Sequence, residues 1–229
     1  MEQRVSSLTK HLRIVFWLDI AIIVCEIVGT VITARMHGLG IFVYFTENSN
    51  FFALFACTCE AICLARFLRA GIPIPHWSRV LKYIATCGLA MTFLVVFLIL
   101  IPWACSAGYD GFRMLLAVGA QPFMHLVCPV IALVSFIFLE TDIPLKRTLV
   151  WLGAAPVYLY GTIASILNIL RVMVGPYPFL YFYQQPVWAS VLWIAALFVF
   201  GTAIAAAVWA LNRHTLLRSA SAKASTGDR

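Results

Sequence analysis

Six long apolar runs, separated by short hydrophilic connections, constrain the fold of this chain more than any other feature. The runs cover residues 12–34, 44–65, 81–103, 121–140, 148–170 and 186–211. A transmembrane helix needs about 20 predominantly apolar residues, and each run reaches about that length. In hydrocarbon every backbone polar group must be bonded within the protein, and continuous rather than alternating apolar residues favour helices. The sequence therefore predicts an all-α polytopic membrane protein with six transmembrane helices in one bundle, residues 1–211.

The composition and the two ends of the chain agree with this prediction. Of the 229 residues, 63% are hydrophobic and 11% are charged, whereas about a quarter of a soluble domain is charged. The first run is longer than the about 7–15 apolar residues of a signal peptide and carries charged side chains, so we expect it to remain as a helix. The tail, residues 212–229, includes the small and polar stretch RSASAKASTGDR, which predicts a disordered cytoplasmic tail.

The basic residues predict an orientation rather than a nucleic-acid partner. The formal net charge is +7, but the Lys and Arg residues sit in the connections between apolar runs. Of the 16 Lys and Arg, only Arg35, Arg113 and Arg171 fall in the connections on the side opposite the termini. The positive-inside rule then places both termini in the cytoplasm, in a cell inner or plasma membrane. The sequence leaves the oligomeric state open.

The cysteines and histidines do not indicate a metal site or a cofactor. Six of the seven Cys lie within apolar runs, which is no disulfide framework. Cys57, Cys59 and Cys63 have no paired His nearby, so we interpret them as packing residues. Haem ligation across a bundle would need several intramembrane His, and this chain has one.

The stretch YFTENSN, residues 44–50, places polar side chains at the start of the second run. Helical spacing puts Thr46, Ser49, Asn50 and Glu60 on one face, opposite large apolar residues. Glu47 lies about 100° around the helix from Thr46, so we expect it to point elsewhere. The same residue types are typical of helix starts, where they satisfy free N–H groups.

His125 is the one intramembrane His of five in the chain. At about 1.5 Å per residue, Thr46 and His125 both lie within the first ~10 Å from the outer surface, and Asn168 lies at a similar depth. Ionisable and polar residues at such depths are costly and are candidates for function. The alternative is a structural role, in which His125 forms a hydrogen bond between helices and takes no part in chemistry.

Three carboxyl side chains lie deeper in the predicted bundle. Asp19 and Glu60 belong to its inner half, and Glu26 lies near the middle. Their role stays open between protonated structural carboxyls and a separate inner polar cavity.

Three motifs in order along the six runs are similar to those of a known family. YFTENSN, HLVCPVIAL (residues 125–133) and VGPYPFL (residues 174–180) resemble the androgen-induced and androgen-dependent transmembrane proteins, and more closely their uncharacterised bacterial relatives. The resemblance covers most of residues 12–211. It implies hydrolysis of fatty acid esters of hydroxy fatty acids, with Thr46 as nucleophile, His125 as its catalytic partner and no cofactor.

The implied chemistry needs further groups around Thr46. A Thr hydroxyl is a weak nucleophile that requires an adjacent base, and His is the usual base near neutral pH. Asn50 and Asn168 are the expected oxyanion or substrate contacts. The expected partner is a membrane lipid or fatty-acyl ester, which enters sideways from the outer leaflet of the bilayer.

Two other classes of function remain open. A small transporter or proton-coupled carrier would use Asp19, Glu26, Glu60 and His125 as a relay, and needs a continuous polar path between the outer and inner layers. A non-catalytic membrane scaffold or sensor predicts that Thr46 and His125 do not face one another.

Overall fold

The computed structural model describes residues 2–226, with side chains for residues 9–38 and 40–221. Every regular element in this range is helical, which confirms the all-α prediction. The α-helices are α1 (Glu2–His37), α2 (Phe45–Ala70), α3 (His76–Val95), α4 (Ile101–Ser106), α5 (Gly111–Leu116), α6 (Cys128–Val134), α7 (Val150–Ile169) and α8 (Val187–Thr226). The π turns are η2 (Val96–Leu100), η3 (Phe123–Val127) and η4 (Ser135–Leu139); the 3-10 turns are η1 (Gly38–Val43), η5 (Arg147–Leu149), η6 (Pro178–Leu180) and η7 (Phe182–Gln184).

Five helical segments in the described chain have the length and composition to cross a membrane. They are Thr9–His37, Phe45–Ala70, His76–Ser106, Arg147–Ile169 and Val187–Ser221. The fourth predicted run forms a shorter apolar helix, Phe123–Leu139, so five of the six expected spans reach membrane length. The length and the apolar composition of these segments are those of helices in an integral membrane protein.

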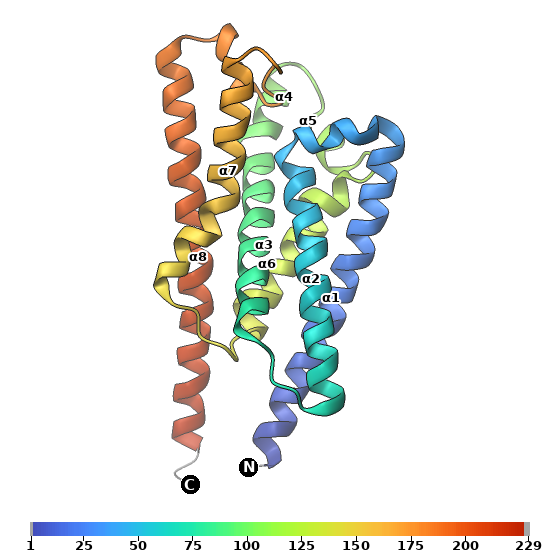
Figure 1. The fold of residues 1–229 in the computed structure, drawn as a ribbon, viewed down its shortest axis with the longest axis vertical. Coiled ribbons are helices and arrows are strands. Elements are labelled where there is room, and N and C mark those ends of the chain that lie inside the picture. The colour runs from blue at the N-terminus through green and yellow to red at the C-terminus, as the bar shows by residue number, and fades with distance from the viewer. Residues whose placement is uncertain (1, 227–229) are drawn as a thin grey trace.

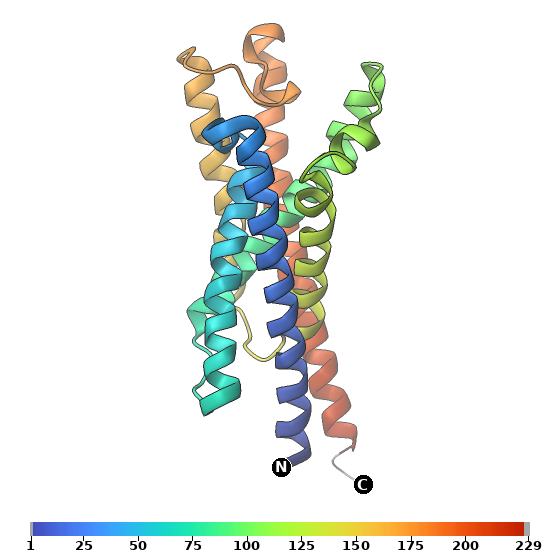
Figure 2. The ribbon, with the colours of Figure 1, turned by 90° about the vertical axis from the view of Figure 1, so that its right-hand side faces the viewer.

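The helices form one elongated bundle with α3 between two pairs. Figure 1 shows α1 and α2 on one side of α3, and α7 and α8 on the other, with α6 behind. The two ends of the described chain lie at the same end of the bundle (Figures 1 and 2). The largest core cluster joins α3, α7 and α8, and the buried Tyr83 donates its hydroxyl to the Ala205 carbonyl at 2.7 Å.

Helix α2 ends abruptly at Gly71, before the connection to α3. Gly71 adopts the left-handed conformation (φ 66°) and its N–H bonds the Phe67 carbonyl at 2.8 Å, an arrangement that favours glycine. Two prolines follow, and α3 then begins at His76, earlier than the predicted 81. Arg79 and Lys82, interpreted from the sequence as residues at the cytoplasmic surface, therefore lie inside the first turns of α3 and are buried.

A proline explains the π turn that carries His125. Pro129 has no N–H, so the carbonyl four residues earlier, that of His125, lacks its ordinary helical partner. The helix widens there into η3, immediately before α6. Such π turns occur often at functional sites.

Helix α8 continues past residue 212, where the sequence predicts the start of a disordered tail. The helix runs to Thr226, and residues 227–229 lie outside the described chain. Asn212, at the expected start of the tail, is buried and its Nδ2 donates to the carbonyls of Phe136 at 2.7 Å and Glu140 at 3.0 Å. Beyond it, Leu, Ala, Arg and Lys are good helix formers.

Candidate active site at the start of α2

The start of α2 borders a cavity of about 290 Å³, which we call the outer cavity. Helix α1, the residues before and within the first turn of α2, η2, α4, α5, η3 and the loop before η6 contribute to its wall. Its polar lining residues are Thr33, His37, Tyr44, Thr46, Glu47, Gln121, His125, Tyr177 and Tyr181. The outer cavity therefore contains both residues that the sequence proposed as a catalytic pair.

His125 is buried and held by a backbone group. Its Nδ1 lies 2.6 Å from the carbonyl oxygen of Leu115 in α5. Because a carbonyl oxygen can only accept, Nδ1 carries the proton, and in the neutral ring Nε2 is the free basic nitrogen. The group that orients the His125 ring is thus a main-chain carbonyl, which has no sequence signature.

Neighbouring helices fix the turn that bears His125. Asn50 Nδ2 in α2 donates to the Met124 carbonyl at 3.5 Å, and the Thr33 hydroxyl in α1 lies 3.8 Å from the Met124 sulfur. A Cβ on Gly29 would lie 3.6 Å from the Met124 side chain, so η3 packs closely on α1. Together with the bond to Leu115 in α5, these contacts mean that α1, α2 and α5 set the position of His125.

Glu47 also lines the outer cavity, contrary to the expectation that it would point elsewhere. It is buried, as Thr46 is. Both residues belong to the first turn of α2, and the outer cavity extends around the end of the helix rather than along one face. Helical angles therefore did not predict which first-turn side chains reach it.

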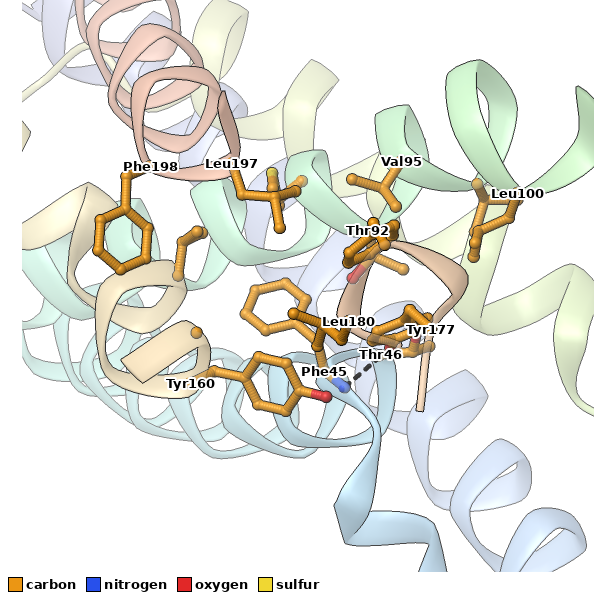
Figure 3. A pocket seen from close by; sticks show the side chains of 15 residues that line it. Phe45, Thr46, Thr92, Val95, Leu100, Tyr160, Tyr177, Leu180, Leu197 and Phe198 are labelled. Carbon is orange, nitrogen blue, oxygen red and sulfur yellow. Dashed lines mark hydrogen bonds between the residues drawn. The ribbon is translucent and has the colours of Figure 1, made fainter. Parts of the chain in front are cut away.

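A second cavity, the apolar cavity, lies on the other side of Thr46 (Figure 3). Its volume is about 50 Å³, and its wall comes from the start of α2, α3, η2, α7, the loop at η6 and α8. Figure 3 shows Thr46 beside Tyr177, with Leu197 and Phe198 of α8 on the far side. Thr46, Leu100 and Tyr177 line both cavities, so Thr46 stands between a polar and an apolar compartment.

Tyr177 is a site residue that the sequence placed only in the VGPYPFL motif. Its hydroxyl accepts the N–H of Phe45 at 2.9 Å and interacts with the Thr46 side chain. Burial raises the pKa of Tyr177 above its ordinary value, so the phenol stays protonated near neutral pH. The Tyr177 oxygen is the acceptor in the bond from Phe45, and the hydroxyl proton remains available as a donor.

The loop that carries Tyr177 needs glycine at one position. A Cβ added to Gly175 would lie 2.3 Å from the carbonyl oxygen of Leu180. The loop therefore folds back on itself too closely for any side chain at this position.

The two asparagines proposed as oxyanion contacts lie elsewhere. Asn50 is fully buried and its Nδ2 donates to the Thr46 carbonyl at 2.8 Å, besides the bond to Met124. Asn168 donates to the Leu180 carbonyl at 2.5 Å and lines a separate pocket beside Arg171. Neither lines the outer or the apolar cavity. Both instead form hydrogen bonds that hold neighbouring segments of the chain together.

The deep carboxyls Asp19 and Glu60 pair with cations that the sequence analysis missed. The Lys82 ammonium in α3 pairs with Asp19 in α1, donates to Cys57 Sγ at 3.3 Å and lies 3.9 Å from Glu140. Lys82 and Asp19 are both fully buried. The presence of buried acids without a counter-charge was the signal that a basic partner must lie nearby.

Arg79 connects three acids across the bundle. One guanidinium nitrogen bonds Glu60 and lies 3.2 Å from Glu140, and the other bonds Asp142 bidentately at 2.8 and 2.9 Å. Ser135 adds a bond of 2.7 Å to Glu140. We call Asp19, Glu60, Arg79, Lys82, Glu140 and Asp142 the charged network. It holds α1, α2 and α3 to the segment after η4.

Glu26 remains apart from the charged network. It is fully buried, and its carboxyl interacts with the thiol of Cys128 in α6. The described part of the chain has no group of three or more His, Cys, Asp or Glu placed to hold a metal ion. All seven Cys are free thiols.

Comparisons with known protein families, with curated proteins and with solved structures find no match for this chain. The family resemblance therefore rests on the three sequence motifs and stays a prediction.

Proposed function

We propose that this chain is an integral membrane hydrolase of fatty-acyl esters, with Thr46 as nucleophile and His125 as general base. The observation that carries the proposal is the position of Thr46, which shares the outer cavity with His125 and also borders the apolar cavity. An ester of a long acyl chain needs such a junction, because its carbonyl and its leaving group are polar while the chain is not.

The protonation state of His125 suits the first step. With Nδ1–H bound to the Leu115 carbonyl, Nε2 is free to take the proton of the Thr46 hydroxyl as Oγ1 attacks the ester carbonyl carbon. The tetrahedral intermediate collapses to an acyl-threonine, and His125 returns the proton to the departing alkoxide. Water then attacks the acyl-threonine by the same route, releasing the fatty acid and restoring Thr46.

Two features at the start of α2 suit the developing oxyanion. Tyr177 has a hydroxyl proton available beside Thr46. The N-terminus of α2, a long helix, adds the positive end of its dipole. Stabilisation of this kind is usually the largest single contribution to acyl-transfer catalysis.

The positive-inside argument assigns a side to this chemistry. With both termini cytoplasmic, the outer cavity opens toward the extracytoplasmic leaflet of the cell membrane. The substrate is then a lipid or fatty-acyl ester of that leaflet.

The test is ester hydrolysis by the purified protein in lipid nanodiscs, with wild type compared with Thr46→Val and His125→Gln. Each variant is expected to lose kcat by at least about a hundredfold, as loss of a nucleophile or general base does. Thr58→Val is the matched control, because Thr58 lies on α2, is exposed and bonds only the Leu54 carbonyl of its own helix. Full activity in folded Thr46→Val would show that the nucleophile is wrong.

The charged network favours proton-coupled transport as a second candidate, since buried ion pairs line the pathways of many carriers. None of the residues of the charged network lines the outer or the apolar cavity. Proteoliposomes loaded with a pH-sensitive dye separate the two functions: substrate-driven proton flux that is lost in Asp19→Asn, with Thr46→Val unaffected, would favour the carrier.

A further inference from the structure

A large groove lies beside the apolar cavity, on the membrane-facing surface between α2 and α7. Its volume is about 840 Å³, and α3 forms its floor. Its rim includes Leu159 and Ile163 of α7, which are 66% and 48% exposed. We call it the lateral groove. Because both flanking helices are membrane-length, these exposed apolar side chains meet hydrocarbon rather than water.

The polar side chains of the lateral groove have already made their hydrogen bonds within the protein. Asn48 Nδ2 donates to the carbonyls of Phe42 and Tyr44, both at 2.7 Å. The Ser49 hydroxyl bonds that of Thr92 at 2.9 Å. The groove therefore offers an apolar wall without an unsatisfied donor, which suits a hydrocarbon chain and not a polar ligand.

Two aromatic residues separate the lateral groove from the apolar cavity. Phe45 and Tyr160 line both spaces, with ring centroids 5.3 Å apart in an edge-to-face arrangement. The Tyr160 hydroxyl donates to the Val43 carbonyl at 2.8 Å. Figure 3 shows the Tyr160 ring beside Phe45, the residue that precedes Thr46 in the chain. We call these two residues the aromatic pair.

The volumes require the aromatic pair to move when substrate binds. A cavity of about 50 Å³ is far below the about 300–1,000 Å³ of ordinary ligand sites, whereas the lateral groove lies within that range. A long acyl chain therefore does not fit beside Thr46 while the pair is closed. Rotation of the two rings would join the groove to the cavity and bring the ester end of a chain in the groove to Thr46.

We propose that the lateral groove binds the long acyl chain of a membrane ester, and that Phe45 and Tyr160 gate its passage to Thr46. The inference rests on the proposed function, and it names the access route and the substrate class, long-chain acyl esters taken from within the bilayer. The closed pair separates hydrocarbon in the lateral groove from the apolar cavity beside Thr46.

The first test fills the lateral groove without touching Thr46. Ala155 lines the groove on α7, and Ala155→Trp is expected to reduce kcat/KM for a hexadecanoyl ester by more than about tenfold while a butanoyl ester is hydrolysed as in wild type. Ala203→Trp, at an exposed position on α8, is the matched control. Equal loss for both esters, or no loss for either, would overturn the assignment of the groove.

A second measurement does not depend on hydrolysis. A hexadecanoyl ester with a diazirine at the chain end, photolysed in nanodiscs, is expected to label peptides of α2 and α7 in Thr46→Val, and to lose that labelling in Thr46→Val/Ala155→Trp. Labelling spread over all helices alike, and unchanged by Ala155→Trp, would refute the groove. Retained labelling with no hydrolysis in wild type would refute the proposed function while supporting the groove.

Discussion

Replacement of Lys82 by Met tests how the charged network holds the bundle. Met keeps an unbranched apolar stem of similar length but removes the ammonium. Lys82 is fully buried and is the cation that pairs with Asp19, whose second oxygen, Oδ2, has no hydrogen-bond partner among the described residues. The substitution therefore leaves Asp19 buried and without its counter-charge.

The magnitude follows from the burial of both partners. Removal of one member of a buried ion pair costs about 3–5 kcal/mol, whereas replacement of both by apolar groups is often neutral or stabilising by about 1–4 kcal/mol. We therefore expect Lys82→Met to lower the free energy of unfolding by about 3–5 kcal/mol and Asp19→Leu/Lys82→Met to recover most of it. For chains of this size about 1 kcal/mol shifts the Tm by about 2–4 °C, so the single variant should melt roughly 10 °C lower.

The assay is thermal unfolding in detergent, followed by tryptophan fluorescence, on wild type, the two single variants and the double variant. The coupling energy between Lys82 and Asp19 is the quantity that decides. A single-variant cost below about 1 kcal/mol, or strictly additive costs in the double variant, would refute the interpretation that the two side chains form a buried pair.

Two further predictions concern the loop beside the candidate active site. Gly175→Ala should displace the loop, because its Cβ would lie 2.3 Å from the Leu180 carbonyl oxygen; we expect a Tm loss and lower hydrolysis, while Gly40→Ala, with no atom within 4 Å of the added Cβ, should match wild type in both. Tyr177→Phe should lower kcat by about a hundredfold with KM nearly unchanged, as loss of an oxyanion donor does. Because burial keeps the Tyr177 pKa above its ordinary value, the wild-type rate should show no loss from this group between neutral and mildly alkaline pH, and an ionisation there would contradict its role as a donor.

The parts of the structure that depend on local chain properties could be predicted from the sequence. Continuous apolar runs predicted the helices, and the small and polar face of α2 predicted the burial of Thr46 and Asn50. The placement of Thr46 and His125 on one cavity needed more than spacing, since η3 is a π turn and its side chains do not follow the ordinary 100° steps.

The parts that depend on tertiary contacts could not be predicted. Arg79 and Lys82 look like residues of a hydrophilic connection, and only the earlier start of α3 and the acids of three other segments make them buried partners. The Leu115 carbonyl that orients His125 is a backbone atom and carries no sequence signal. Glu47 reaches the outer cavity because that cavity surrounds a helix end, which periodicity along the helix does not describe.

The short helix Phe123–Leu139 has a consequence for the membrane itself. At about 1.5 Å per residue this segment covers roughly 25 Å, less than the about 30 Å of a typical hydrocarbon layer, while its neighbours are long enough to cross it. Local thinning of the bilayer at the short segment is one way to relieve such a hydrophobic mismatch. His125 lies at the start of that segment, so lipid thinned in this way would lie next to the proposed general base. Because such thinning would bring the head-group boundary, with its ester carbonyls and water, toward Thr46, we expect the rate of the proposed hydrolysis to depend on bilayer thickness.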